Sequence, residues 1–190
     1  DKIKINIDDA SLCPRYIGAI LDDIEVKESP KWLKNRLKSI GLDPVNNVVD
    51  VSNFIMYEYG TPMHAFDRSK LGKNITVKKA DKGSSFKTLD GTERKLSGEE
   101  LMITSEGKNL CIAGVFGGLD SGVSENTKSI FLEAAIFNAT SVRKTSKAHA
   151  IQTDASFRFE RGVDPSFTED AMNRAISIIQ EITGAKLTMK

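Results

Sequence analysis

The stretch Ser129–Phe137, SIFLEAAIF, is apolar at every position except its first residue and Glu133. A short apolar run rich in isoleucine and phenylalanine predicts a β-strand of the protein core. Glu133 is out of place there, because a carboxylate that is buried without a partner loses its solvation energy. Either Glu133 faces solvent on an edge strand, which the alternation of strand side chains permits, or it is buried. Both interpretations stay open at this point.

Further strands are predicted on the N-terminal side of this stretch. Ile3, Ile5 and Ile7 alternate with polar residues, which is the period of a half-buried strand. The dipeptide Asp90-Gly91 is a hairpin turn signal between two short β-type runs. The predicted strands, besides 3–7 and 129–137, cover residues 13–26, 75–80, 84–89, 92–96, 100–105 and 110–116.

Helices are predicted from end signals and apolar spacing. In the first helix, 28–41, Ser29 is a candidate N-cap, Pro30 suits the first turn and Gly41 follows the end. Its apolar side chains are expected on one face, and they are Trp32, Leu33, Leu37 and Ile40. The other predicted helices cover 46–60, closed by Gly60, 139–149, capped by Asn138, and 167–183, stopped by Gly184.

Two segments are predicted to be loops. The segment TPMHAFD, 61–67, follows a glycine and contains a proline, and it holds His64, one of two histidines in the chain. His64 either lines a pocket or only hydrogen-bonds backbone as a capping residue. The second segment, 150–165, contains Thr153 and Ala155.

The order of the elements indicates an α+β fold. A helical N-terminal part precedes a strand-rich middle and a helical C-terminal part. We expect a single domain, a layered sandwich in which helices cover a mainly antiparallel β core. At 190 residues the chain is long enough to bury a substantial core.

The composition argues against several classes of protein. With 27 Lys and Arg against 26 Asp and Glu, the net charge is +1, so no global attraction to nucleic acid or membrane follows. No apolar run approaches the ~20 residues of a membrane span. Cys13 and Cys111 form no CxxC pair, which fits a reducing cytosol and argues against structural zinc. The chain has no initiator methionine, which suggests a domain excised from a longer chain.

The remaining motifs are weak. The glycines of AGVFGG, 113–118, lack the context of a phosphate loop, and they suit a backbone that passes close to a ligand or another strand. The basic residues Arg143, Lys144, Lys147, Arg158 and Arg161 form either a phosphate contact or a solvated face. Histidines and carboxylates have no spacing typical of metal ligands, so no metal is expected. The residues alone therefore predict a cytosolic α+β domain with a pocket but no particular reaction.

From Cys13 to about Ala185 the chain resembles the editing module of the bacterial phenylalanyl-tRNA synthetase β chain. The matching pieces occur in order: CPRY, SPKWLKNRL, NNVVDVSNFIMYEYGTPMHAFD, LDG, IAGVFGG, FLEAAIF and TDASFRFERGVDP. The last piece and HAFD are the most specific. The departures are conservative: relatives usually have threonine and tyrosine at Ser52 and Phe54, and methionine is common at Phe116.

The resemblance implies that this module hydrolyses tyrosine attached in error to phenylalanine tRNA. A hydrophobic pocket rejects an added hydroxyl by only about a hundredfold, so a second site that prefers the hydroxyl removes the error. By resemblance, Glu133 accepts the tyrosine hydroxyl, and His64 lies near the ester or terminal adenosine and orients water or the tRNA end. The implied catalytic residues are His64 and Glu133, and the implied substrate-binding residues are Asn53, Gly114, Glu133, Thr153 and Ala155.

The resemblance also implies partners. These are phenylalanine tRNA, the synthetase α subunit and the remainder of the β chain, in a cytoplasmic α2β2 tetramer. ATP and magnesium belong to the parent enzyme, and no cofactor is expected in this domain. Two alternatives stay open: a non-catalytic module that contacts RNA or a subunit, and a free-standing deacylase that acts in trans. Intact Glu133, His64 and Thr153 weigh against the first, and the missing methionine weighs against the second.

Overall fold

The strand predicted from SIFLEAAIF exists as β10, Ser129–Ile136, in a computed structural model that describes residues 2–190. Contacts between residues divide the chain into two compact units. Unit 1 comprises the described residues up to Arg15 together with Lys70–Gly122 and Ile136–Val163. Unit 2 comprises Tyr16–Ser69, Val123–Ala135 and Asp164–Lys190, and it contains nearly all of β10.

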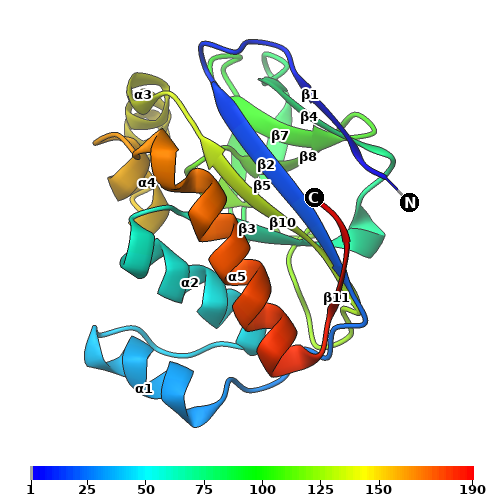
Figure 1. The fold of residues 1–190 in the computed structure, drawn as a ribbon. Coiled ribbons are helices and arrows are strands. Elements are labelled where there is room, and N and C mark those ends of the chain that lie inside the picture. The colour runs from blue at the N-terminus through cyan, green and yellow to red at the C-terminus, as the bar shows by residue number, and fades with distance from the viewer. Residues whose placement is uncertain (1) are drawn as a thin grey trace. The chain divides into compact units, whose positions relative to one another are not determined.

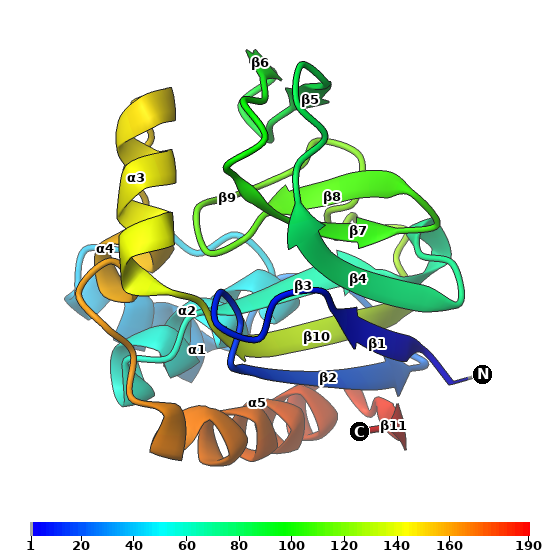
Figure 2. The ribbon, with the colours of Figure 1, turned by 90° about the horizontal axis from the view of Figure 1, so that it is seen from above.

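Unit 2 consists of a four-stranded sheet and three helices. The sheet has the order β11-β2-β10-β3, in which β2 is Arg15–Asp22, β3 is Met63–Asp67 and β11 is Lys186–Met189. The helices are α1 (Lys31–Ser39), α2 (Asn47–Tyr59) and α5 (Thr168–Thr183). Figures 1 and 2 show α5 running along β2 and β10.

The core of unit 2 lies between its sheet and its helices. Alternate residues of β10, among them Leu132, are buried in one cluster with Val51 of α2 and Ala175 of α5. Helix α2 forms where the sequence predicts it, because the Asn46 side chain accepts from the backbone N–H groups of Val48 and Val49. The alternation of β10 therefore fixes one face of the sheet against the helices and directs Glu133 to the other face.

Unit 1 contains a five-stranded sheet of order β1-β4-β7-β8-β9. Its strands are β1 (Lys4–Ile7), β4 (Asn74–Lys79), β7 (Leu101–Ser105), β8 (Lys108–Ile112) and β9 (Phe116–Gly117). The hairpin β5 (Ser85–Lys87) and β6 (Glu93–Lys95), α3 (Ala139–His149) and α4 (Asp154–Phe159) complete it. Strand β1 pairs parallel with β4, and the rest of this sheet pairs antiparallel. Two single turns of 3-10 helix, Arg68–Lys70 and Pro165–Phe167, lie between elements. The α+β class with mainly antiparallel sheets is confirmed.

Several boundaries differ from the sequence prediction. The predicted loop 61–67 is largely strand β3, because its proline precedes the strand and leaves the ladder to β10 intact. The predicted strand 110–116 is broken by a turn between β8 and β9, at Gly114 with φ 69°. The predicted loop 150–165 contains α4, and β11 was not predicted.

The prediction that Ser29 caps α1 is wrong. The N-cap is Pro30, which makes no side-chain cap, and the Ser29 hydroxyl instead donates to Oδ2 of the buried Asp50 at 2.5 Å. The predicted apolar face of α1 is also only half correct, because Leu33 and Leu37 are buried whereas Trp32 and Ile40 are exposed.

We expect Ser29→Ala to lower the free energy of unfolding by about 1.5–3 kcal/mol, because it removes a hydrogen bond to a buried carboxylate. Ser39→Ala, whose hydroxyl only bonds the carbonyl of Arg36 at an exposed helix end, is the control and should change it by less than ~0.5 kcal/mol. Urea unfolding measures both. If Ser29→Ala and Asp50→Asn combine additively, the Ser29–Asp50 contact is not the source of the effect.

Candidate functional site

Glu133 lies in the middle of a sheet and is buried. Strand β10 has β2 on one side and β3 on the other, and only 5% of the Glu133 surface is exposed. The solvent-facing edge-strand interpretation is therefore wrong. The hydroxyl of Tyr16 on β2 donates to Oε2 of Glu133 at 2.5 Å, so the buried carboxylate has a partner. Burial raises the pKa of Glu133 to about 7, and the Tyr16 hydrogen bond lowers it only in part.

His64 lies directly opposite Glu133 on the neighbouring strand. Their Cα positions pair in the antiparallel ladder of β3 and β10, so both side chains project from the same face of the sheet. His64 is half-buried and its ring lies 4.2 Å from that of Phe66, centroid to centroid. Burial lowers the pKa of His64 to about 4, which makes the imidazole neutral at pH 7. His64 is not in a loop, as the sequence predicted, but in a strand.

Nε2 of His64 is buried and has no hydrogen-bond partner in the part of the chain that the structure describes. The same is true of Oγ1 of Thr61, three residues earlier. A buried polar atom without a partner costs about 1–3 kcal/mol, so such atoms in folded proteins mark a place for a ligand or water. The three side chains Tyr16, Glu133 and His64 thus form one polar cluster on the sheet face away from the helices.

Tyr16 was not among the site residues predicted from the sequence. The hydroxyl partner is 117 positions away from Glu133, so no spacing relates the two. The one usable indication is chemical, because a carboxylate in an apolar strand needs a donor somewhere in the fold.

The remaining candidates in unit 1 also form a group. Oγ1 of Thr153 donates to the carbonyl oxygen of Val115 at 2.8 Å, which ties the start of α4 to the turn that contains Gly114. The same oxygen accepts from the backbone N–H of Ser156 in a capping box. Ala155 follows in the first turn of α4. The structure thus brings Gly114, Thr153 and Ala155 close together.

The structure explains why position 114 is a glycine, which the sequence alone did not. An added Cβ would lie 2.9 Å from Phe159 and 3.0 Å from Phe137, and its φ of 69° favours glycine. Its predicted approach to a ligand stays a prediction. Asn53 lies half-buried on α2, and no hydrogen bond joins it to His64 or Glu133 within the described chain. That all six residues line one cavity also stays a prediction.

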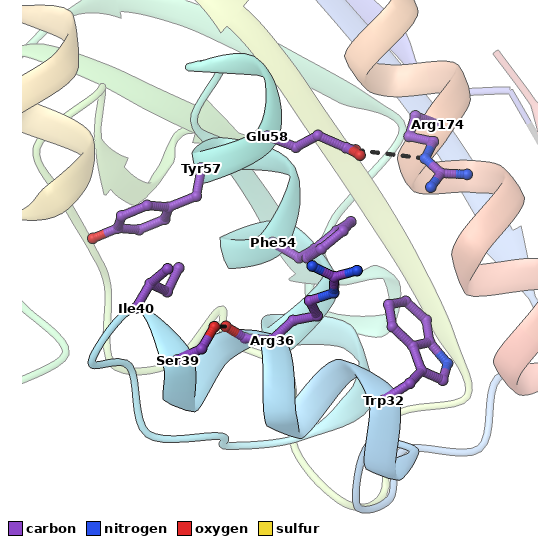
Figure 3. Close-up of a pocket in the computed structure, with 8 residues that line it drawn as sticks. All are labelled: Trp32, Arg36, Ser39, Ile40, Phe54, Tyr57, Glu58 and Arg174. Carbon is purple, nitrogen blue, oxygen red and sulfur yellow. Dashed lines mark hydrogen bonds and ion pairs between the residues drawn. The ribbon is translucent and has the colours of Figure 1, made fainter.

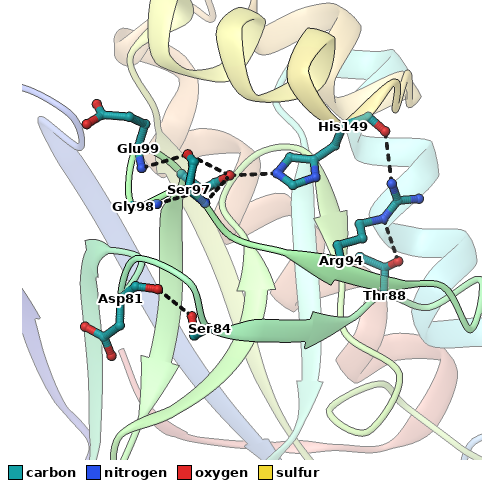
Figure 4. A network of polar contacts seen from close by, with 9 residues as sticks. Asp81, Ser84, Thr88, Arg94, Ser97, Gly98, Glu99 and His149 are labelled. Atoms are coloured by element: carbon teal, nitrogen blue, oxygen red, sulfur yellow. Dashed lines mark hydrogen bonds and ion pairs between the residues drawn. The ribbon is translucent and has the colours of Figure 1, made fainter.

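The second histidine belongs to a structural network. Nε2 of His149 lies 2.7 Å from Oε1 of the buried Glu100, and Arg94 donates to the carbonyl oxygen of His149 (Figure 4). Burial would raise the pKa of Glu100, but hydrogen bonds from His149, Ser97 and neighbouring backbone hold it at about 2. These contacts connect α3 to the β6–β7 segment, and they explain this histidine without a ligand.

Two kinds of feature are absent from the residues that the structure describes. Among residues 2–190, no group of three or more His, Cys, Asp or Glu side chains is arranged to hold a metal ion. In the same range, no helix is long and apolar enough to cross a membrane. The expected lack of a metal or cofactor stays a prediction.

Comparison with known proteins identifies relatives. Residues 12–184 match the B3/4 domain family. The chain is 52% identical over 188 residues to the phenylalanine–tRNA ligase beta subunit of Porphyromonas gingivalis, covering 98% of this chain and 23% of that protein. It is 49% identical over 186 residues to the beta subunit of Bdellovibrio bacteriovorus, with 97% and 23% covered. The chain thus spans about a quarter of the length of these relatives.

A solved structure has the same fold. The crystal structure of an N-terminal fragment of the phenylalanyl-tRNA synthetase beta subunit from Pyrococcus horikoshii matches 98% of this chain and 52% of its own, with a TM-score of 0.63. Because the sequence identity is 14%, this likeness supports the fold alone.

The raised pKa of Glu133 predicts a stability that depends on pH. The folded carboxyl binds its proton more tightly than the unfolded one, so its contribution is present below pH 4.5 and is lost as pH rises through about 7. The unfolding free energy of wild type minus that of Glu133→Gln should therefore fall by about 3 kcal/mol as pH rises from about 4.5 to about 7. Urea unfolding at several pH values measures it, with Glu93→Gln on the exposed hairpin as control. A difference independent of pH would contradict the burial argument.

Proposed function

Because this chain belongs to the B3/4 domain family and is homologous along nearly its whole length to part of phenylalanine–tRNA ligase beta subunits, we propose that it hydrolyses tyrosine mis-attached to phenylalanine tRNA. It would do so as the editing module of a synthetase whose α subunit and remaining β chain are its partners in the cytoplasm. ATP and magnesium would serve the parent enzyme, and this domain would use no cofactor. The observation that supports the proposal most is the hydrogen bond from the Tyr16 hydroxyl to Glu133, which shows that this carboxylate can accept from a phenol.

Glu133 already accepts a hydrogen bond from a phenol hydroxyl, that of the protein's own Tyr16. Tyr16 occupies a position on Oε2, whereas a carboxylate offers two oxygens and about four acceptor positions in all. A substrate tyrosine can therefore bind the same carboxylate beside Tyr16. Phenylalanine offers no such donor, so the carboxylate would keep Tyr16 alone and would lose solvent without gaining a second hydrogen bond, at a cost of about 1–3 kcal/mol.

The hydrolysis itself needs little more than a positioned water. The water oxygen bonds to the ester carbonyl carbon, the bond to the ribose oxygen breaks, and the proton that the water loses balances the proton that the ribose oxygen takes up. The products are free tyrosine and uncharged tRNA. An aminoacyl ester is already reactive, so holding the water in line supplies much of the rate.

His64 suits the positioning role better than that of a general base. With its pKa near 4, the ring is a weak proton acceptor at neutral pH. Its buried Nε2, which has no partner among the described residues, is free to accept from a water or from a ribose hydroxyl. Thr153 and Ala155 would line the amino-acid cavity, Gly114 would bring backbone to the ligand, and Asn53 would bind substrate, as the resemblance implies.

Glu133→Ala tests the specificity proposal. Tyrosine would lose a charge-assisted hydrogen bond of roughly 1.5–3 kcal/mol, and phenylalanine would lose nothing. The ratio of deacylation rates for Tyr-tRNA and Phe-tRNA should therefore fall about ten- to a hundredfold. Glu125→Ala, an exposed acid of the same unit, should leave the ratio unchanged. Equal loss of both rates in Glu133→Ala would show that Glu133 serves folding or chemistry and not specificity.

Tyr16→Phe tests whether the charge of Glu133 matters for specificity, because this variant keeps the Glu133 side chain and changes only its pKa. The Tyr16 hydrogen bond lowers the pKa of Glu133, so its removal should raise that pKa and reduce the charged fraction at pH 7. Preference for Tyr-tRNA should fall at pH 7 and recover at higher pH. Tyr59→Phe on α2 is the matched control. A loss of preference that is the same at every pH would mean that Tyr16 only fills space.

A further inference from the structure

A pocket of about 460 Å³ lies among the three helices of unit 2. It is lined by Trp32, Arg36, Ser39 and Ile40 from α1 and its end, Phe54, Tyr57 and Glu58 from α2, and Arg174 from α5 (Figure 3). None of the proposed editing residues lines it, so it is a separate place in the fold.

The walls of the pocket are exposed aromatic rings. Trp32 is 42% exposed and Tyr57 39% exposed, although both are large apolar side chains. Trp32 packs edge-on against Phe54, with the ring centroids 5.8 Å apart. Exposed apolar side chains that gather in one hollow indicate a binding site more than scattered ones do. Flat rings of this kind stack well on another planar ring.

The rim of the pocket is positively charged. Its charged lining residues are Arg36, Arg174 and Glu58, which leaves a net positive charge. Helix α1 also carries three lysines outside the lining, one of which, Lys34, is paired with Glu28. Arg174 is paired with Glu58 at 3.5 Å, whereas Arg36 forms no ion pair within the described chain. Figure 3 shows the Arg36 side chain extending from α1 toward Phe54 and the mouth of the pocket. Its planar guanidinium matches the oxygens of a phosphate.

We propose that this pocket binds two neighbouring unpaired nucleotides of a single-stranded nucleic acid, with one base against Trp32, the next base against Tyr57 and the phosphate on Arg36, which lies between the two rings in Figure 3. Sites for single strands combine aromatic platforms with a basic groove, because every base has a π-face and every nucleotide a charge. An acidic peptide would satisfy the charge of α1 but would leave the rings without a planar partner. The combination of both features therefore favours a nucleotide.

Trp32 reports on this pocket directly, because it is the only tryptophan of the chain. Titration with a hexamer of adenylate should change Trp32 fluorescence, and the affinity should fall as salt rises. A hexamer of glutamate, with comparable charge and no rings, should bind at least about tenfold more weakly, since base stacking is worth roughly 1–3 kcal/mol per base.

Two variants separate the phosphate contact from the stacking contact. Arg36→Gln should weaken binding and reduce the slope of log affinity against log salt by about one. Tyr57→Ala should weaken oligonucleotide binding about ten- to a hundredfold and should leave the slope of log affinity against log salt nearly unchanged. Lys108→Gln at the exposed start of β8 in unit 1 is the control for loss of one positive charge and should leave affinity unchanged.

Three outcomes would overturn the proposal. The first is unchanged Trp32 fluorescence at millimolar oligonucleotide. The second is equal binding of the glutamate hexamer, which would indicate an acidic peptide site. The third is equal loss of affinity in Arg36→Gln and Lys108→Gln, which would indicate attraction to positive charge in general. The assay measures binding and not deacylation, so its result is independent of the proposed editing activity.

Discussion

The hydrogen bond between Tyr16 and Glu133 is the contact on which the site depends. A carboxylate in the middle of a sheet, 5% exposed, is stable only if a donor satisfies it or a proton neutralises it. The Tyr16 hydroxyl, 2.5 Å away on the next strand, supplies the donor, and a pKa near 7 keeps both charge states within reach at neutral pH. The register that sets His64 opposite Glu133 then adds a neutral imidazole to the same face.

Elements with strong local signals could be predicted from the sequence. Strand β10 follows from its apolar run, α2 from its apolar spacing and Gly60 at its end, and α5 from its stop at Gly184. Their signals lie within one or two turns of the element, so no tertiary information is needed. The same holds for the hairpin at Asp90-Gly91.

Features that depend on distant partners could not be predicted from sequence patterns. Strand β3 exists because β10 pairs with it, and α4 is a short helix held by the contact of Thr153 with Val115. Ser29 fits an N-cap on local grounds, but the buried Asp50 competes for its hydroxyl and wins. Glu133 and His64 were already conspicuous in the sequence, and the family resemblance supplied roles for these two and for Gly114 and Thr153. Tyr16 became visible only through its contact in the fold.

The buried carboxylate of Glu133, we propose, selects for a tyrosine hydroxyl on an aminoacyl-tRNA. The most direct test is the rate at which the unaltered chain deacylates Tyr-tRNA and Phe-tRNA, measured side by side at pH 7.5. We expect the tyrosyl ester to be hydrolysed at least about tenfold faster, because one charge-assisted hydrogen bond is worth roughly 1.5–3 kcal/mol. Equal rates, or faster hydrolysis of the phenylalanyl ester, would contradict it.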